Sequence, residues 1–151
     1  GFKSPSLIKL EWGHVDSSSF TYNIVCDSTV DMYTMELPPM VLQPFIENSI
    51  KHGLQHKEGS KRIDMSFSFN EDDEVLSCLI QDNGIGRKAS EAINNKRLGH
   101  QSFATTATTR RFEMLNQNSE QPFLYTYTDI VDAEGNALGT AVSINIPSIF
   151  Q

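Results

Sequence analysis

Apolar and polar residues alternate along four stretches of the chain, and a period of two residues is typical of strands that bury one face. These stretches are residues 20–26, 63–69, 123–127 and 142–146. A further strand is predicted for the apolar run 75–80. Because only the short acidic run 71–74 separates this strand from the one before it, we expect the two to form a β-hairpin.

A helical period covers residues 41–53. One arc of this helix is mainly apolar and would be buried against a sheet; it holds Val41, Leu42, Phe45, Ile46, Ser49 and Ile50. Prolines suit the first turn of a helix and glycines its end, so Pro38 and Pro39 predict the start and Gly53 predicts the end.

The opposite arc of the same helix groups side chains that bind ligands. Asn48, Lys51 and His52 stand at i, i+3 and i+4, so an amide, an ammonium and an imidazole would project together. Glu47 lies one step round the helix from them. This polar arc is the first candidate for a binding site.

Shorter patterns predict the remaining elements of the chain. Residues 7–12 are typical of the end of a helix, 87–95 and 105–115 predict two short helices, and 96–103 predict a polar loop. The resulting order is strand, helix, two strands, two helices, two strands. It predicts an α+β fold: a two-layer sandwich of a mixed, largely antiparallel sheet with helices on one face. Too few helices separate the strands for a doubly wound parallel fold.

The length and composition of the chain exclude some classes of function. The 151 residues fit one domain, and no apolar run approaches the roughly 20 residues of a membrane span. The formal net charge of −7 argues against direct nucleic-acid binding, which needs a basic stripe. The first residues look like an internal boundary with a cloning remnant. We therefore expect residues 1–13 to be the end of an upstream helix or linker, and 14–151 to be the domain.

The two cysteines, Cys26 and Cys78, lie in separate strand-like runs and have no metal-binding spacing. Buried free thiols are the favoured interpretation, with a disulfide as the alternative. Basic residues gather near predicted loops, where they either hold a small anion or are ordinary solvated charges.

A second candidate site follows the third strand, where residues 82–86 read DNGIG. Here a carboxylate at the end of a strand precedes two glycines, which allow a sharp turn and a close approach of the backbone to a ligand. Asp-Asn-Gly is also a common turn. This motif alone therefore leaves both interpretations open.

Three motifs in order carry a family resemblance: residues 38–53 (PPMVLQPFIENSIKHG), 82–86 (DNGIG) and 135–147 (GNALGTAVSINIP). Together they resemble the GHKL ATPases, whose fold is the Bergerat fold. The sequence of these motifs most resembles the ATP-binding catalytic domain of sensor histidine kinases that partner response regulators with LytTR-type DNA-binding domains. The resemblance extends over nearly the whole chain from about Leu7.

The resemblance implies roles at the phosphate end of a nucleotide. Asn48 would hold Mg²⁺ through its side-chain oxygen, a hard ligand. Lys51 would contact phosphate as a point charge. Glu47 is the candidate catalytic residue, a base or polarising group near the γ-phosphate.

The resemblance also implies roles at the base end. Asp82 would accept a hydrogen bond from the exocyclic amine of adenine, and Gly84 and Gly86 would leave room for the base. His52 would lie against the nucleotide, and Thr140 would approach adenine from the last hairpin.

The chain departs from the family pattern at two positions. Pro44 stands where gyrase-like relatives carry a catalytic glutamate, so water activation by that route is in doubt, although transfer to a histidine does not need it. In the lid, residues 99–105 read GHQSFAT, and Ala104 would replace a glycine, which would weaken or alter lid closure. The helix start at Thr105 could still offer amides to a phosphate.

As a whole, the resemblance implies an ATP- and Mg²⁺-dependent kinase domain of a two-component system that phosphorylates a histidine on a dimerisation domain of the same protein. None of His14, His56 and His100 resembles that phosphoacceptor. A response regulator would be the next partner, and the full protein would be a membrane-anchored homodimer, in the inner membrane, with this domain in the cytoplasm. The alternatives are a degenerate nucleotide-binding regulatory module and an anti-sigma-type serine kinase.

Overall fold

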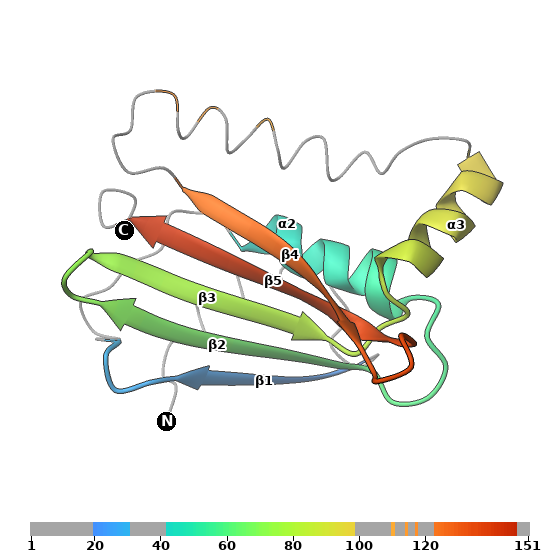
Figure 1. Cartoon of the computed structure of the whole chain (residues 1–151), viewed down its shortest axis with the longest axis horizontal. Helices are drawn as coiled ribbons and strands as arrows, with labels where there is room; N and C mark the ends of the chain where they lie inside the picture. Colours follow the sequence, from blue (N-terminus) through green and yellow to red (C-terminus); the bar gives the residue numbers. More distant parts are fainter. Residues whose placement is uncertain are drawn as a thin grey trace.

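The computed structural model describes residues 20–30, 42–98, 110, 114, 117 and 123–147. Their elements, in chain order, are β1 (Thr21–Cys26), α2 (Gln43–Asn48), the π-helical segment η2 (Ser49–Leu54), β2 (Arg62–Asn70), β3 (Val75–Asp82), α3 (Arg87–Leu98), β4 (Leu124–Val131) and β5 (Ala137–Pro147). Figure 1 shows the sheet in front of α2.

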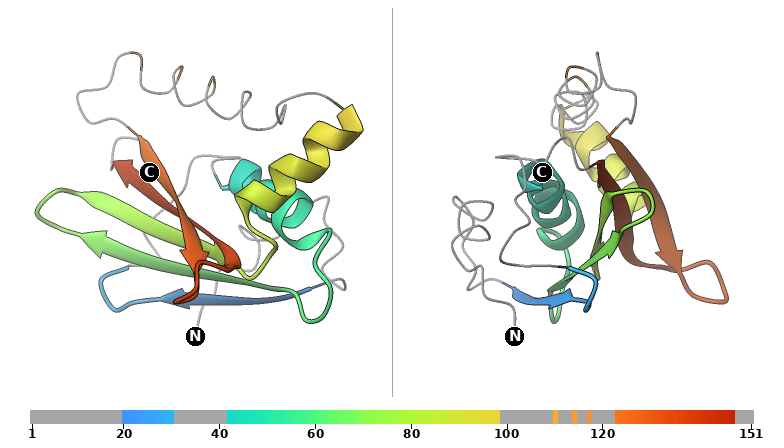
Figure 2. Two further views of the ribbon diagram at one scale, coloured as in Figure 1. Left: turned by 45° about the vertical axis from the view of Figure 1, so that its right-hand side comes forward. Right: turned by 90° about the vertical axis from the view of Figure 1, so that its left-hand side faces the viewer.

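The five described strands form one sheet in the order β1-β2-β3-β5-β4. β1 pairs with β2 in parallel, while the β2–β3, β3–β5 and β4–β5 pairs are antiparallel. Figure 2 shows α2 and η2 on one side of this sheet. The predicted α+β sandwich with a mixed, largely antiparallel sheet is therefore confirmed, as is the hairpin between β2 and β3.

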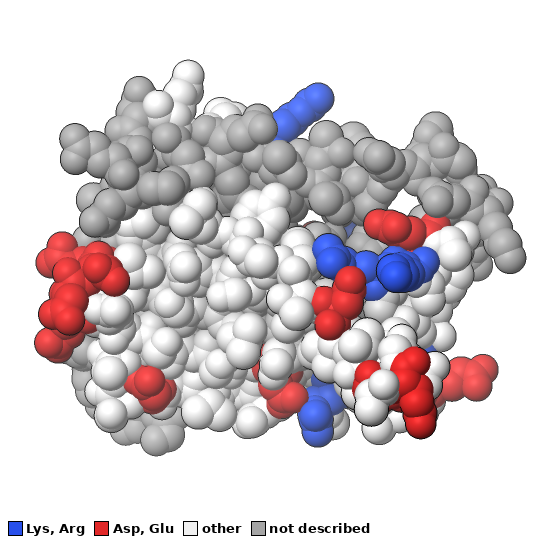
Figure 3. Space-filling model, viewed as in Figure 1, with Lys and Arg blue, Asp and Glu red and all other residues white. Residues whose placement is uncertain are grey.

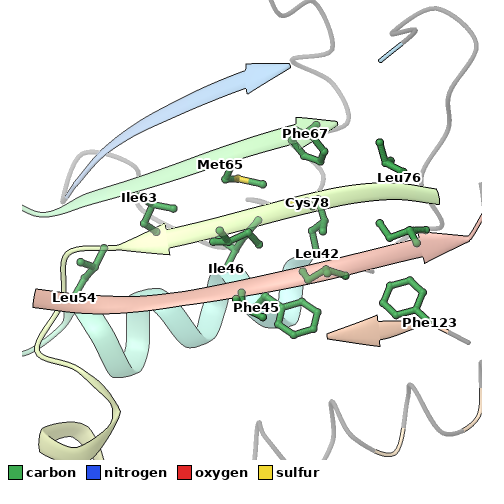
Figure 4. Packing of buried hydrophobic residues seen from close by; sticks show 14 of the residues in the cluster. Leu42, Phe45, Ile46, Leu54, Ile63, Met65, Phe67, Leu76, Cys78 and Phe123 are labelled. Carbon is green, nitrogen blue, oxygen red and sulfur yellow. The ribbon is translucent and has the colours of Figure 1, made fainter. Parts of the chain in front are cut away.

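The core lies between the sheet and α2 (Figure 4). Every second residue of β2, β3 and β5 points into it, as the period of two predicts: Ile63, Met65, Phe67, Leu76, Cys78, Ile80, Val142, Ile144 and Ile146. Leu42, Phe45 and Ile46 fill it from the helix side. Each such burial stabilises the fold by about 1.5–3 kcal/mol.

The opposite face of the sheet carries small polar side chains, and Ser77 there donates a hydrogen bond to Asn145 across the β3–β5 pair, at 2.9 Å. Figure 3 shows that the centre of this face bears few charges, while acidic side chains gather at the β2–β3 turn. The outer face is thus largely uncharged, and it mixes small polar side chains with apolar ones such as Leu124, which is 53% exposed.

The predicted helix end at Gly53 is wrong. The helix widens at Ser49 into η2 and continues to Leu54, and the Gln55 N–H donates to the Ile50 carbonyl at 2.8 Å, the i→i+5 bond of a π-helix. Gly53 does not have the positive φ that marks a glycine helix end among the described residues. Its small size serves a close backbone approach instead.

Two smaller differences concern element ends. α3 runs to Leu98, so residues 96–98 are helical and not part of the predicted loop. Tyr22 falls on the inner period of β1 but is 51% exposed, and β1 lies at the edge of the described sheet. Cys26 and Cys78 are free thiols, as favoured from the sequence.

The predicted helix start at Pro38 and Pro39 is wrong: α2 begins at Gln43, after a bend at Leu42, and Pro44 is the proline of its first turn. Other predictions lie outside the described residues: the helix end at 7–12 and the lid at 99–105 with its Ala104. Of the predicted helix 105–115, only Arg110 and Met114 are described, and both are helical. No helix in the described ranges is long and apolar enough to cross a membrane.

Candidate functional site

A cavity of about 160 Å³ opens where η2, the end of β3, the start of α3 and the β4–β5 hairpin meet. The residues that line it come from these elements, from the last residue of α2 and from the loop before α3: Asn48, Ser49, His52, Gly53, Ile80, Asp82, Gly86, Arg87, Ser90, Glu91, Tyr127, Thr140 and Val142. The cavity therefore joins the two candidate sites of the sequence, although they are some 30 residues apart.

Asp82 is the buried charge of this cavity, with 5% of its surface exposed. Its Oδ1 accepts a hydrogen bond from the Gly84 N–H at 2.9 Å. Burial raises the pKa of Asp82, and hydrogen bonds from Gly84, Ser49 and the Thr140 backbone act in the opposite direction. The site thus holds a carboxylate acceptor that water reaches poorly and that a ligand with an N–H donor would satisfy.

Two glycines allow the walls around Asp82 to close. A Cβ on Gly84 would overlap the backbone of Gly53, and a Cβ on Gly53 would lie 2.8 Å from Asp82 Oδ1. The Ile85 N–H donates to the Gly53 carbonyl at 3.0 Å and joins the two segments. The glycines at these positions are required by the close approach of η2 to the 82–86 loop.

Asn48 lines the cavity and carries an acceptor that has no partner in the described part of the chain. Its Nδ2 donates to the Tyr127 hydroxyl at 3.4 Å, whereas its Oδ1 is buried and accepts no hydrogen bond from the described part of the chain. A buried amide oxygen without a partner costs about 1–3 kcal/mol, which calls for an explanation such as a bound ion or water. An amide oxygen is a ligand that suits Mg²⁺.

His52 lies half-buried against the same cavity. Burial lowers its pKa, and the charges of Lys51 and His56 lower it further. The imidazole is therefore neutral at physiological pH and offers a flat surface to a ligand.

Lys51 and Glu47 do not line the cavity. A π-helix has more residues per turn than an α-helix, so each residue rotates less, and His52 returns to the Asn48 face while Lys51 falls short of it. Lys51 is accordingly exposed. Glu47 is half-buried and accepts a hydrogen bond from Gln43 Nε2 at 2.8 Å.

Gly86 and Thr140 line the cavity as predicted, and Gly84 is buried beside it. Thr140 is opposite Asp82 in the β3–β5 register, which explains why a residue so distant in sequence reaches the same site.

Two further residues line the cavity: Arg87, considered from the sequence only as one of several basic residues near loops, and Tyr127, which sequence reasoning missed. Arg87 forms a bidentate ion pair with Asp129, with Nε–Oδ1 and Nη2–Oδ2 distances of 2.8 and 3.1 Å, and lies 5.5 Å from the centre of the Tyr127 ring. Burial raises the pKa of Tyr127, so its hydroxyl stays protonated. Figure 3 shows basic and acidic side chains side by side around this part of the surface.

The signals for these two residues were present but weak. Arg87 directly follows the DNGIG motif, and Tyr127 stands on the inner period of β4, where a core role was the simpler interpretation.

No protein-family model matches the chain. Sensor proteins named LytS do match it: the one from Staphylococcus epidermidis RP62A is 31% identical over 111 residues, and the one from Staphylococcus haemolyticus is 33% identical over 116 residues. Each match covers 74% of this chain but only 18% of the relative, so the chain spans about a fifth of the length of these proteins.

The fold agrees with solved histidine kinase domains. The catalytic domain of the histidine kinase ThkA superposes with a TM-score of 0.56 at 10% identity, over 94% of this chain and 91% of that one. A mycobacterial sensor histidine kinase, MprB, gives 0.57 at 14% identity, over 94% and 92%. The chain is thus similar in sequence to LytS sensor proteins and has the fold of histidine kinase catalytic domains.

The matches confirm the predicted resemblance to sensor histidine kinases and the GHKL histidine kinase fold. They do not favour the alternatives, a degenerate module or an anti-sigma-type serine kinase. The cavity itself offers a buried carboxylate acceptor, a neutral imidazole and an amide oxygen that has no partner among the described residues.

Proposed function

We propose that this domain binds Mg²⁺-ATP in the cavity and transfers the γ-phosphate to a histidine on a dimerisation domain of the same protein. The buried Asp82 carboxylate, which lines the cavity beside the close approach of Gly53 and Gly84, carries the proposal. An amine donor satisfies such an acceptor, and a base with a carbonyl at that position would be repelled by it. This chemistry supports adenine over guanine.

The base end of the proposed site is apolar around this one acceptor. Ile80 and Val142 line the cavity on the sheet side, and His52 offers its neutral ring from η2. Thr140 and Gly86 border Asp82 from the last hairpin and from the DNGIG loop.

The phosphate end is proposed for the side near Asn48 and the start of α3. Bound Mg²⁺ would be held by Asn48 Oδ1 and would neutralise phosphate charge. Lys51, although exposed, is a flexible cation that can contact phosphates extending beyond the cavity. Glu47 is retained as the proposed polarising residue for the transfer.

The remaining parts of the proposal concern the longer protein. Residues 14–151 would form the catalytic domain, and 1–13 its connection to the dimerisation helices. A response regulator, with a LytTR-type DNA-binding domain, would receive the phosphate. The complete protein would be a membrane-anchored homodimer with this domain on the cytoplasmic side. The similarity to LytS sensor proteins supports these assignments.

Calorimetric titration with a non-hydrolysable ATP analogue tests the nucleotide site. Asp82→Asn is expected to lower the affinity about tenfold or more, since hydrogen bonds to charged groups contribute about 1.5–3 kcal/mol. Asp64→Asn, on β2 in an ion pair with Arg62, is the matched control and should leave the affinity unchanged. A folded wild-type chain that binds no adenine nucleotide at millimolar concentration would contradict the proposal.

Transfer itself is tested by supplying the dimerisation domain with radiolabelled ATP. Labelling of its histidine that depends on Mg²⁺ and on Asp82 supports the kinase assignment. Nucleotide binding without any transfer, under conditions where a known kinase domain labels its own partner, would argue for a regulatory module instead.

A further inference from the structure

The Tyr127 hydroxyl lies at the wall of the cavity and accepts the Asn48 Nδ2–H at 3.4 Å. We propose that Tyr127 is a positioning residue for the metal ligand, because this hydrogen bond occupies the amide nitrogen of Asn48 and leaves the amide oxygen without a partner among the described residues. The inference rests on the proposed binding of Mg²⁺-ATP.

The two ends of the Asn48 amide differ in their chemistry. One end of the side chain is a double donor and the other is an acceptor, and rotation by half a turn exchanges them. A divalent cation binds the oxygen and is repelled by the NH₂ group. The side chain is therefore a metal ligand in only one of its two orientations.

In the structure the amide takes that orientation, with its nitrogen on the Tyr127 hydroxyl. Oδ1 is then left buried and accepts no hydrogen bond from the described residues. A tyrosine hydroxyl can accept one hydrogen bond while it donates another, so its own proton remains available to a second acceptor.

The Tyr127 ring is held on several sides, which makes it suitable for this role. Its centroid lies 6.0 Å from that of Tyr125 in an edge-to-face contact, and 6.3 Å from that of Phe45. Arg87 lies 5.5 Å from the ring centre on a further side and is itself fixed by Asp129. A hydroxyl on a fixed ring can orient a neighbouring amide without loss of its own freedom on binding.

The substitution Tyr127→Phe tests the inference, because it keeps the ring and its packing and removes only the hydroxyl. We expect the affinity for the ATP analogue in Mg²⁺ to fall about three- to tenfold, the size of one net hydrogen bond, while the affinity measured in EDTA stays unchanged. The apparent Mg²⁺ affinity, measured by titrating metal into the nucleotide complex, should fall by the same factor.

Tyr125→Phe is the matched control, since Tyr125 stands on the same strand and the same face but does not line the cavity. It should change neither affinity. Equal losses with and without Mg²⁺ in Tyr127→Phe would indicate a merely structural role and overturn the inference.

A double-mutant cycle sharpens the test. Asn48→Ala should remove the Mg²⁺ dependence, and in that background Tyr127→Phe should have no further effect on it. Additive losses would show that Tyr127 acts independently of Asn48 and would overturn the inference while leaving the nucleotide site intact. A wild-type chain whose nucleotide binding ignores Mg²⁺ would instead contradict the proposed function and this inference with it.

Discussion

The alternate side chains of β3 that point toward the helix side of the sheet differ between the two ends of the strand. Leu76, Cys78 and Ile80 fill this row with apolar side chains, each at most 3% exposed, and the next position in the row is Asp82, at 5%. The apolar end is covered by the packed core (Figure 4), whereas the Asp82 end opens into the cavity. A single period of two residues thus runs from a core into a site, and only the residue type marks the transition.

The helix that covers the core changes its geometry at the point where the core gives way to the cavity. α2 packs Phe45 and Ile46 against the sheet as a regular helix, and η2 widens where the cavity begins. The regular helix α2 lies over the core, and the irregular segment η2 lies at the cavity. π-helical turns are often found in functional regions. Substitutions at the two ends should therefore affect different properties.

The largest effect is expected at the core end. Ile46→Ala removes a side chain with 0% exposure and should lower the free energy of unfolding by about 2–5 kcal/mol, measured by denaturant titration. Val25→Ala, at a position 51% exposed, is the control and should cost much less. Comparable losses from both would mean that the core is not centred between the sheet and α2.

A smaller loss of stability with a complete loss of binding is expected for Gly84→Ala. The added methyl group overlaps the Gly53 backbone, so η2 and the 82–86 loop must move apart, at a cost of about 1–3 kcal/mol typical of overpacking. Calorimetry and thermal unfolding would measure the two effects. Unchanged nucleotide affinity in this variant would show that the close approach does not shape the site.

Asp82→Asn tests the difference between the core end and the site end most directly. We expect it to raise the free energy of unfolding while it lowers the affinity for the nucleotide. Burial raises the pKa of Asp82 in the folded chain, so ionisation of this group opposes folding. The stabilising contribution of protonated Asp82 is fully present below the pKa that this group has in the unfolded chain. It is lost as the pH rises through the pKa of Asp82 in the folded chain. The stability advantage of the Asp82→Asn variant should accordingly be present at pH 7 and shrink in acid. Parallel unfolding curves of both chains across that range would check the sign, and a constant difference would contradict it.

The smallest effect is expected for Asp129→Asn at the rim of the cavity. The side chains of Arg87 and Asp129 are 46% and 41% exposed, and surface ion pairs contribute at most about 1 kcal/mol. Thermal unfolding at low and high salt should differ little between this variant and the wild type. A large, salt-insensitive loss would mean that the pair is a structural part of the site wall.

Most of the fold could be predicted from the sequence, because its strands have one buried face and therefore a clear period. Ile63, Met65 and Phe67 are an example. The parallel pairing of β1 with β2 was not predicted, since a local pattern carries no information about which distant strand becomes the neighbour.

The candidate site was predicted less evenly. Asn48, His52 and Asp82 were found through their motifs and do meet at one cavity. The position of Lys51 could not be anticipated, because a period of 3.6 residues assumes a regular helix and η2 is not regular. Tyr127 was hidden for another reason: a buried tyrosine on an inward row has the same pattern whether it packs or binds.

The pairing of β3 with β5 also bears on how the domain folds. Each of the β2–β3 and β4–β5 hairpins is local in sequence, but Asp82 and Thr140 meet only through the long-range β3–β5 pair. Contacts of this kind carry a larger loop-closure cost and form late. The site therefore does not exist in either hairpin alone, and it is completed only when the hairpins dock. A nucleotide that binds there would favour the docked state by mass action, so that occupancy and completion of the fold would rise together.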